Sequence, residues 1–203
     1  MQARVSRRQA RPTITEHARR AQIVAAAIDT IVELGYPQAS FSQIAKRAGL
    51  SSTGLISYHF KTKRELDGAI VGEIFGRLTH HMTDAMSGVA DPRSALVAYI
   101  EGLIGFMKQD PHALQALMGL LMNGGFAYDA DDEREAISHI GNILRWGQEE
   151  GVFRDFDIQV MATTIQRSLD GIPLAQSTTP DLDLDAYARE LVELFTLATQ
   201  ARG

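Results

Sequence analysis

Apolar residues recur at intervals of three and four positions along almost the whole chain of 203 residues. This spacing is the period of an amphipathic α-helix, whereas a half-buried strand would alternate apolar and polar residues. No segment of the sequence sustains such an alternation, and the helical stretches differ in length, which argues against a solenoid repeat. The pattern therefore predicts an all-α fold.

Glycine, proline and capping residues divide this pattern into separate helices. Gly35 follows the first apolar stripe, and a glycine just past the last periodic residue favours a left-handed C-terminal cap. Asp91 and Asp110 each precede a proline. An aspartate cap followed by proline at the first helical position predicts helices near residues 92–108 and 111–123.

Two segments match the capping box, in which a hydroxyl and a carboxylate or amide three residues later bond to each other's backbone amides. They are Ser40 to Gln43 and Thr62 to Glu65. Between them lie two short apolar segments separated by Gly49. The sequence therefore predicts two short helices joined by a glycine turn, followed by a longer helix.

Charge is distributed unevenly along the chain, although the overall net charge is only −5. Residues 1–64 hold eleven basic and three acidic residues, a net charge of +8. The remainder holds nine basic and twenty-two acidic residues, a net charge of −13. Such a split suggests a basic head that meets a polyanion and an acidic body that does not.

Several classes of protein are excluded by what the sequence lacks. The absence of cysteine excludes disulfides and thiolate metal sites and makes a cytoplasmic location the expectation. The longest charge-free window, residues 111–128, is interrupted by polar residues and glycines, so no membrane span is expected. His80 and Asp84 fit a solvated helix face better than a metal site, so no metal is expected. Without a G-x-S-x-G, H-E-x-x-H or P-loop motif, neither an enzyme nor a cofactor is expected.

Residues 40–60 have the features of a helix-turn-helix. This motif needs a small residue where its helices cross, a tight turn and buried apolar anchors, and Ala45 and Gly49 supply the first two. The second helix would lie in the major groove, where short hydrogen-bonding groups read bases and rings reach phosphates. Its outward face presents Ser52, Thr53, Ser57, Tyr58 and His59.

The segment from Arg20 to Leu66 resembles the DNA-binding domain of the tetracycline-repressor (TetR) family. The resemblance rests on R-A-Q-I-V-A-A-A, E-L-G-Y, F-S-Q-I-A-K-R-A-G-L-S and I-S-Y-H-F-K-T-K-R-E-L. It implies an all-α homodimer with an N-terminal three-helix helix-turn-helix domain followed by a C-terminal helical ligand-binding and dimerisation domain. Between Gly49 and Phe60 this chain has one residue more than the common pattern, and Ser57 stands where the family often has tyrosine. Alternative assignments of hydroxyl groups to phosphates and bases therefore stay open.

We accordingly expect three parts: a disordered basic arm at residues 1–13, a helix-turn-helix domain at 14–64 and a helical ligand-binding and dimerisation domain at 65–203. The predicted DNA-contacting residues are Arg20, Ser42, Ser52, Thr53, Gly54, Ser57, Tyr58, His59 and Lys63. A methionine- and aromatic-rich set on the later helices fits either a core or an adaptable ligand pocket. The candidate ligand-binding residues are Phe106, Leu117, Met118, Met122, Phe126, Trp146, Ile165, Gln166 and Leu169.

The leading interpretation is a dimeric transcriptional repressor that leaves a near-palindromic double-stranded DNA operator when a small-molecule effector binds. The alternative is a helical protein with an enzymatic body that is localised by its helix-turn-helix head. Dimerisation is expected through residues 161–172 and 184–198, whose apolar stripes are broad. Gly68, Gly72 and Gly76 share one face of the helix after the head; they are either tolerated there or allow a neighbouring helix to approach closely and slide.

Overall fold

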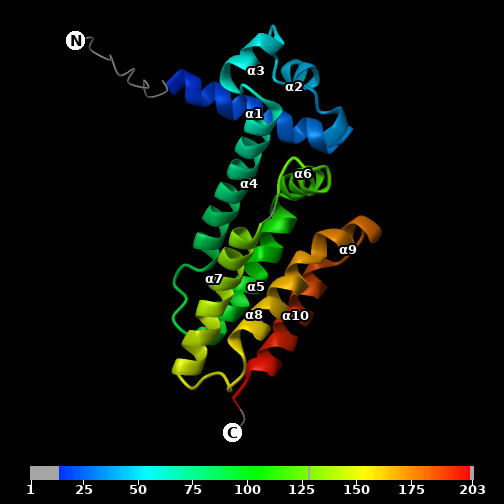
Figure 1. Ribbon diagram of the computed structural model, residues 1–203. Coiled ribbons are helices and arrows are strands. Elements are labelled where there is room, and N and C mark those ends of the chain that lie inside the picture. The colour runs from blue at the N-terminus through cyan, green and yellow to red at the C-terminus, as the bar shows by residue number, and fades with distance from the viewer. Residues whose placement is uncertain (1–13, 128, 202–203) are drawn as a thin grey trace, which may run out of the picture.

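The computed structural model describes residues 14–127 and 129–201, and it confirms the predicted all-α fold (Figure 1). The described residues form no strand, only one isolated bridge between Phe153 and Gln200. The predicted basic arm lies outside them. The elements are α1 (Ile14–Leu34), the 3-10 turn η1 (Tyr36–Gln38), α2 (Phe41–Arg47), α3 (Thr53–His59), α4 (Lys63–Ala85), α5 (Pro92–Gln109), α6 (Pro111–Met122), α7 (Ala130–Glu149), α8 (Ile158–Asp170), α9 (Ile172–Thr178) and α10 (Leu184–Thr199).

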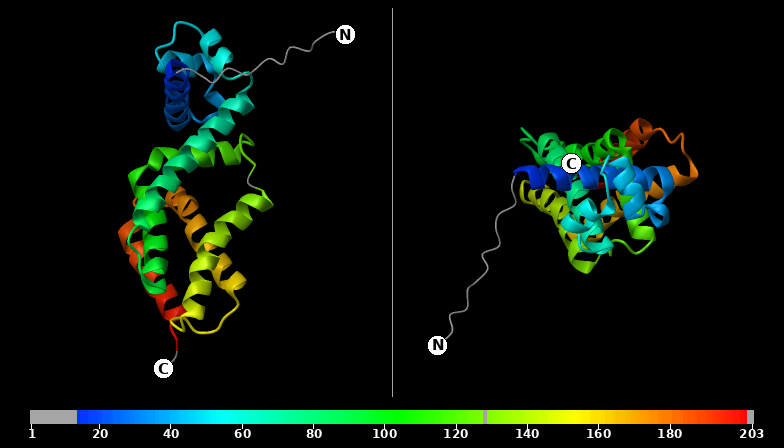
Figure 2. Two further views of the ribbon diagram at one scale, coloured as in Figure 1. Left: turned by 90° about the vertical axis from the view of Figure 1, so that its left-hand side faces the viewer. Right: turned by 90° about the horizontal axis from the view of Figure 1, so that it is seen from above.

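The molecule is elongated, with a small helical head at one end and a helical bundle at the other (Figures 1 and 2). Helices α1, α2 and α3 form the head, and the long α4 runs from the head into the body. Helices α5, α7, α8 and α10 lie along one another in the body, while α6 lies directly beneath α1. None of the described helices is both long and apolar enough to cross a bilayer.

The two aspartates that the sequence predicts as N-terminal caps do cap their helices. Asp91 accepts hydrogen bonds from the amides of Arg93 and Ser94, each at 3.0 Å. The Ser94 hydroxyl also donates to Asp91, and these bonds hold the pKa of that carboxyl below its ordinary value. Asp110 accepts from the amide of Ala113 at 3.0 Å, which starts α6 as predicted.

In each of the two predicted capping boxes, only one of the two reciprocal hydrogen bonds forms. Ser40 Oγ accepts from the amide of Gln43 at 3.3 Å, but the Ser40 amide donates to a carbonyl of the preceding 3-10 turn at 2.8 Å. Thr62 Oγ1 accepts from the amide of Glu65 at 3.1 Å, whereas the Glu65 carboxylate accepts from the amide of Lys61 at 2.8 Å. In each case the turn before the helix determines where the reciprocal bond goes.

Two clusters of buried apolar side chains form the core. The first lies among the helices of the head and α4, where Ile44, Ile56 and Phe60 are completely buried. Phe106 of α5 and Leu120 of α6 belong to the same cluster, so α6 packs as part of the head core. The second cluster fills the body between α5, α7, α8 and α10.

The glycines at which the chain packs closely are not those that the sequence singled out. A Cβ atom built on Gly68, Gly72 or Gly76 would meet no described atom beyond the local helix within 4 Å. Of the two alternatives for these glycines, the close approach of a neighbouring helix is therefore wrong within the described chain, because α4 packs through its opposite face. A Cβ on Gly147 would instead lie 1.9 Å from Cδ2 of Phe153.

Candidate DNA interface and effector region

A tight turn joins α2 to α3 and is tied to α1. Gly49 has a φ of 65°, a conformation that favours glycine, and the Leu50 amide donates to the carbonyl of Ala45 at 2.9 Å. The side-chain amide of Gln22, on α1, donates to the carbonyl of Ala48 at 2.8 Å. The position of the turn is therefore set by all three helices of the head.

Helix α3 presents most of its surface to solvent. Ile56 on its inner side is completely buried, while Tyr58 is 62% exposed. Leu55, the apolar neighbour of Ile56, is exposed, so Ile56 is the buried residue of this short helix. The predicted DNA-contacting residues that are exposed on α2, on α3 or just before it are Ser42, Ser52, Thr53, Gly54, Ser57 and Tyr58.

Arg20, a predicted DNA-contacting residue whose side chain is 37% exposed, also forms contacts within the protein at the end of α3. Its guanidinium donates to the carbonyl of His59 at 2.5 Å and lies 4.1 Å from the centre of the Phe60 ring. It also lies 3.7 Å from the carboxylate of Glu65, at the start of α4. These contacts join α1 to both ends of the loop between α3 and α4, while His59 itself is half-buried.

Lys63 is also engaged within the protein. Its ammonium nitrogen lies 3.0 Å from Oδ1 of Asp67 and 4.1 Å from the centre of the Tyr36 ring. The Tyr36 hydroxyl donates to Oδ2 of the same carboxylate at 2.7 Å. Burial of the phenol, followed by its bond to the Asp67 anion, raises the pKa of Tyr36 to about 12. Sequence reasoning missed Tyr36 and Asp67, although the four-residue spacing of Lys63 and Asp67 was a usable signal.

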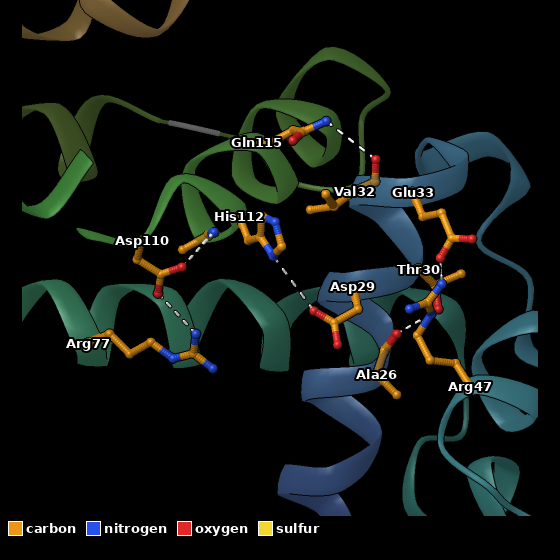
Figure 3. Close-up of polar contacts among 11 residues, drawn as sticks. Ala26, Asp29, Thr30, Val32, Glu33, Arg47, Arg77, Asp110, His112 and Gln115 are labelled. Atoms are coloured by element: carbon orange, nitrogen blue, oxygen red, sulfur yellow. Dashed lines mark hydrogen bonds and ion pairs between the residues drawn. The ribbon is translucent and has the colours of Figure 1, made fainter. Parts of the chain in front are cut away.

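Polar contacts connect the head to the body where α6 lies against α1 (Figure 3). Arg77 on α4 lies 3.0 Å from Oδ2 of Asp110, the residue that caps α6. The Gln115 side chain on α6 donates to the carbonyl of Val32 on α1 at 3.4 Å. The start and the middle of α6 are thus held by α4 and α1 respectively.

The candidate ligand-binding residues are distributed over both core clusters. Phe106, Leu117 and Phe126 pack in or against the first cluster, and Ile165 and Leu169 lie in the second. Trp146 on α7 and Met118 on α6 are half-buried. Met122, at the end of α6, is 76% exposed.

Gln166 belongs to a polar chain within the body core. Its side-chain oxygen accepts from the Tyr99 hydroxyl at 2.9 Å, and its amide donates to Asp170 at 2.8 Å. A recess of about 240 Å³ lies elsewhere, between α5 and α10, and none of its lining residues is a candidate ligand-binding residue. Among the described histidines and carboxylates, no group of three could hold a metal ion.

The head of this chain matches a known protein family. Residues 23–70 match the family described as bacterial regulatory proteins, tetR family. The BetI transcriptional regulator of Klebsiella pneumoniae is 38% identical over 73 residues, which are 36% of this chain and 37% of that relative. An uncharacterised helix-turn-helix regulator of Mycobacterium tuberculosis is 38% identical over 88 residues, 41% of this chain and 45% of the relative. The chain therefore spans less than half the length of these relatives.

Solved structures resemble the whole chain rather than the head alone. A TetR transcription regulator from Haloarcula marismortui superposes with a TM-score of 0.79 at 20% identity and covers 91% of this chain and all of its own. A transcriptional regulator from Saccharomonospora viridis, in complex with choline, superposes with a TM-score of 0.80 at 22% identity over 92% of this chain. At this level of identity the similarity establishes a shared fold.

Proposed function

We propose that this chain, whose residues 23–70 belong to the tetR family of bacterial regulatory proteins, is a ligand-responsive transcriptional repressor. The observation that carries the proposal is the helix-turn-helix, in which α3 is anchored by Ile56 and exposes its polar face. Binding chromosomal DNA would place the chain in the cytoplasm.

The exposed side chains of α3 suit a major groove. Hydroxyl groups of Ser52, Thr53 and Ser57 can bond to base edges, while Ser42 and Tyr58 can reach phosphates. Exposed Leu55 adds a side chain that can contact a thymine methyl group. The exposed Gly54 carries no side chain, which permits a close approach of the backbone to the DNA.

A homodimer would supply two copies of α3 for successive major grooves, roughly 34–36 Å apart or at a multiple of that spacing. Val160 on α8 and Leu194 and Leu197 on α10 are more than half exposed in the single chain. Apolar side chains of this size on two helices favour burial against a second copy. The operator would then be a near-palindrome.

A small molecule bound in the body would act by favouring one spacing of the two heads over another. Such coupling requires only a difference in effector affinity between the two spacings, typically about 1–3 kcal/mol. The structural neighbour from Saccharomonospora viridis is in complex with choline, which supports a small-molecule effector for this fold without identifying it here.

The experiment that tests DNA binding is selection of genomic fragments by the purified full chain, followed by sequencing. We expect retained fragments to share a near-palindromic motif and binding to weaken with salt. Ser57→Glu, which places a negative charge on the outer face of α3, should abolish retention. The matched control is Ser138→Glu on the exposed side of α7. Equal retention by both variants would contradict the proposed role of α3.

A further inference from the structure

A buried carboxylate lies between the start of α4 and the turn after α1. The Asp67 side chain is only 3% exposed and has two partners, the Tyr36 hydroxyl at 2.7 Å and the Lys63 ammonium at 3.0 Å. A buried anion depends on such partners, because an uncompensated charge in the interior is costly. Lys63, in contrast, keeps about a third of its side chain exposed.

The same phenol is contacted from the body by the turn that follows α6. A Cβ atom built on Gly125 would lie 2.7 Å from Oη of Tyr36 and 2.8 Å from its Cζ. Gly125 does not have a positive φ, so this closeness, rather than its backbone conformation, is what requires glycine. The hydroxyl end of Tyr36 therefore lies against Gly125 and bonds to Asp67.

We propose that Tyr36 and Asp67 form a joint through which the turn at Gly124 and Gly125, just after α6, controls how much of the Lys63 charge is available to a DNA phosphate. The inference rests on the proposed DNA-binding function and assigns these two residues a positioning role. When the phenol bonds to Asp67, the carboxylate depends less on Lys63. When the phenol moves away, Asp67 keeps only Lys63 of these two partners, and the carboxylate then holds the Lys63 ammonium more tightly.

The first test neutralises the joint with Asp67→Asn in the full chain. Affinity for a fluorescently labelled random-sequence duplex is measured between about 50 and 200 mM salt, because phosphate contacts are independent of sequence. Releasing Lys63 should tighten binding and steepen the logarithmic salt dependence by about one unit. Glu73→Gln, which removes one negative charge from the same helix at an exposed ion pair, should leave the slope unchanged.

The second test moves the phenol with Gly125→Ala, which should weaken binding and make the slope shallower by up to about one unit. Gly76→Ala, whose Cβ would meet no described atom beyond its own helix within 4 Å, is the control. Tyr36→Phe removes only the hydroxyl and should act in the same direction as Gly125→Ala. In an Asp67→Asn background, Gly125→Ala should no longer change the slope.

The joint is overturned if wild type binds the duplex but Asp67→Asn has the wild-type slope. It is equally overturned if Gly125→Ala changes the slope by the same amount with and without Asp67. A wild-type chain that bound no duplex at any of these salt concentrations would overturn the proposed function, and the joint with it.

Discussion

The basic side chains of the head differ in the contacts that they make within the protein. Arg20 bonds to the carbonyl of His59 and stacks on Phe60, and Lys63 pairs with Asp67. The sequence predicted that both residues contact DNA. A side chain that braces the protein affects DNA affinity through the position of α3, which changes binding without removing a phosphate contact.

The variant Arg20→Gln distinguishes a side chain that supports the position of α3 from one that contacts a DNA phosphate. Loss of the bond to His59 and of the stacking on Phe60 should lower the free energy of unfolding by about 1–2 kcal/mol. Affinity for all duplex sequences should fall. The slope of the logarithm of affinity against the logarithm of salt concentration should change by less than about half a unit, because a lost phosphate contact would change it by about one unit. Thermal denaturation and binding titrations check this. Arg145→Gln, at an exposed site on α7 with a local bond to Asn142, should alter neither quantity.

Among the helices, packing distance decides which glycines matter. Gly147→Ala must displace the ring of Phe153, which is buried in the body core, and should destabilise the protein by about 2–4 kcal/mol. Gly72→Ala faces open space on an exposed side of α4 and should stabilise it by up to about 1 kcal/mol. Denaturant unfolding of both variants measures the difference. Similar values for the two would contradict the assignment of Gly147 to a close contact.

For the molecule as a whole, the exposed apolar residues of α8 and α10 predict a second copy of the chain. Leu197→Arg, at a side chain that is 64% exposed, should weaken the dimer by at least about tenfold and reduce affinity for a near-palindromic operator. Sedimentation at micromolar concentration measures the mass. Met122→Arg is the control, because Met122 is 76% exposed but lies at the end of α6. A monomeric wild type would rule the dimer out.

The all-α fold and the boundaries of α5 and α6 followed from the sequence because their causes are local. The three- to four-residue apolar period, the aspartate caps at Asp91 and Asp110 and the glycine turn at Gly49 each involve residues within a few positions of one another. Helix α1 begins at Ile14, and apolar periodicity did not predict this start, because the buried apolar residues of the helix begin only at Ile23. The helix-turn-helix was predicted for the same local reasons, reinforced by a dense family pattern.

What only the tertiary structure decided depends on residues that are distant in sequence. The Arg20 guanidinium meets His59 across 39 positions, and the Tyr36 hydroxyl meets Asp67 across 31, so no local pattern could distinguish a brace from a phosphate contact. Gly125 requires glycine because Tyr36, from the turn after α1, lies against it. Periodicity shows that a side chain is apolar and on one face of a helix, but the packing of other helices determines what that face meets.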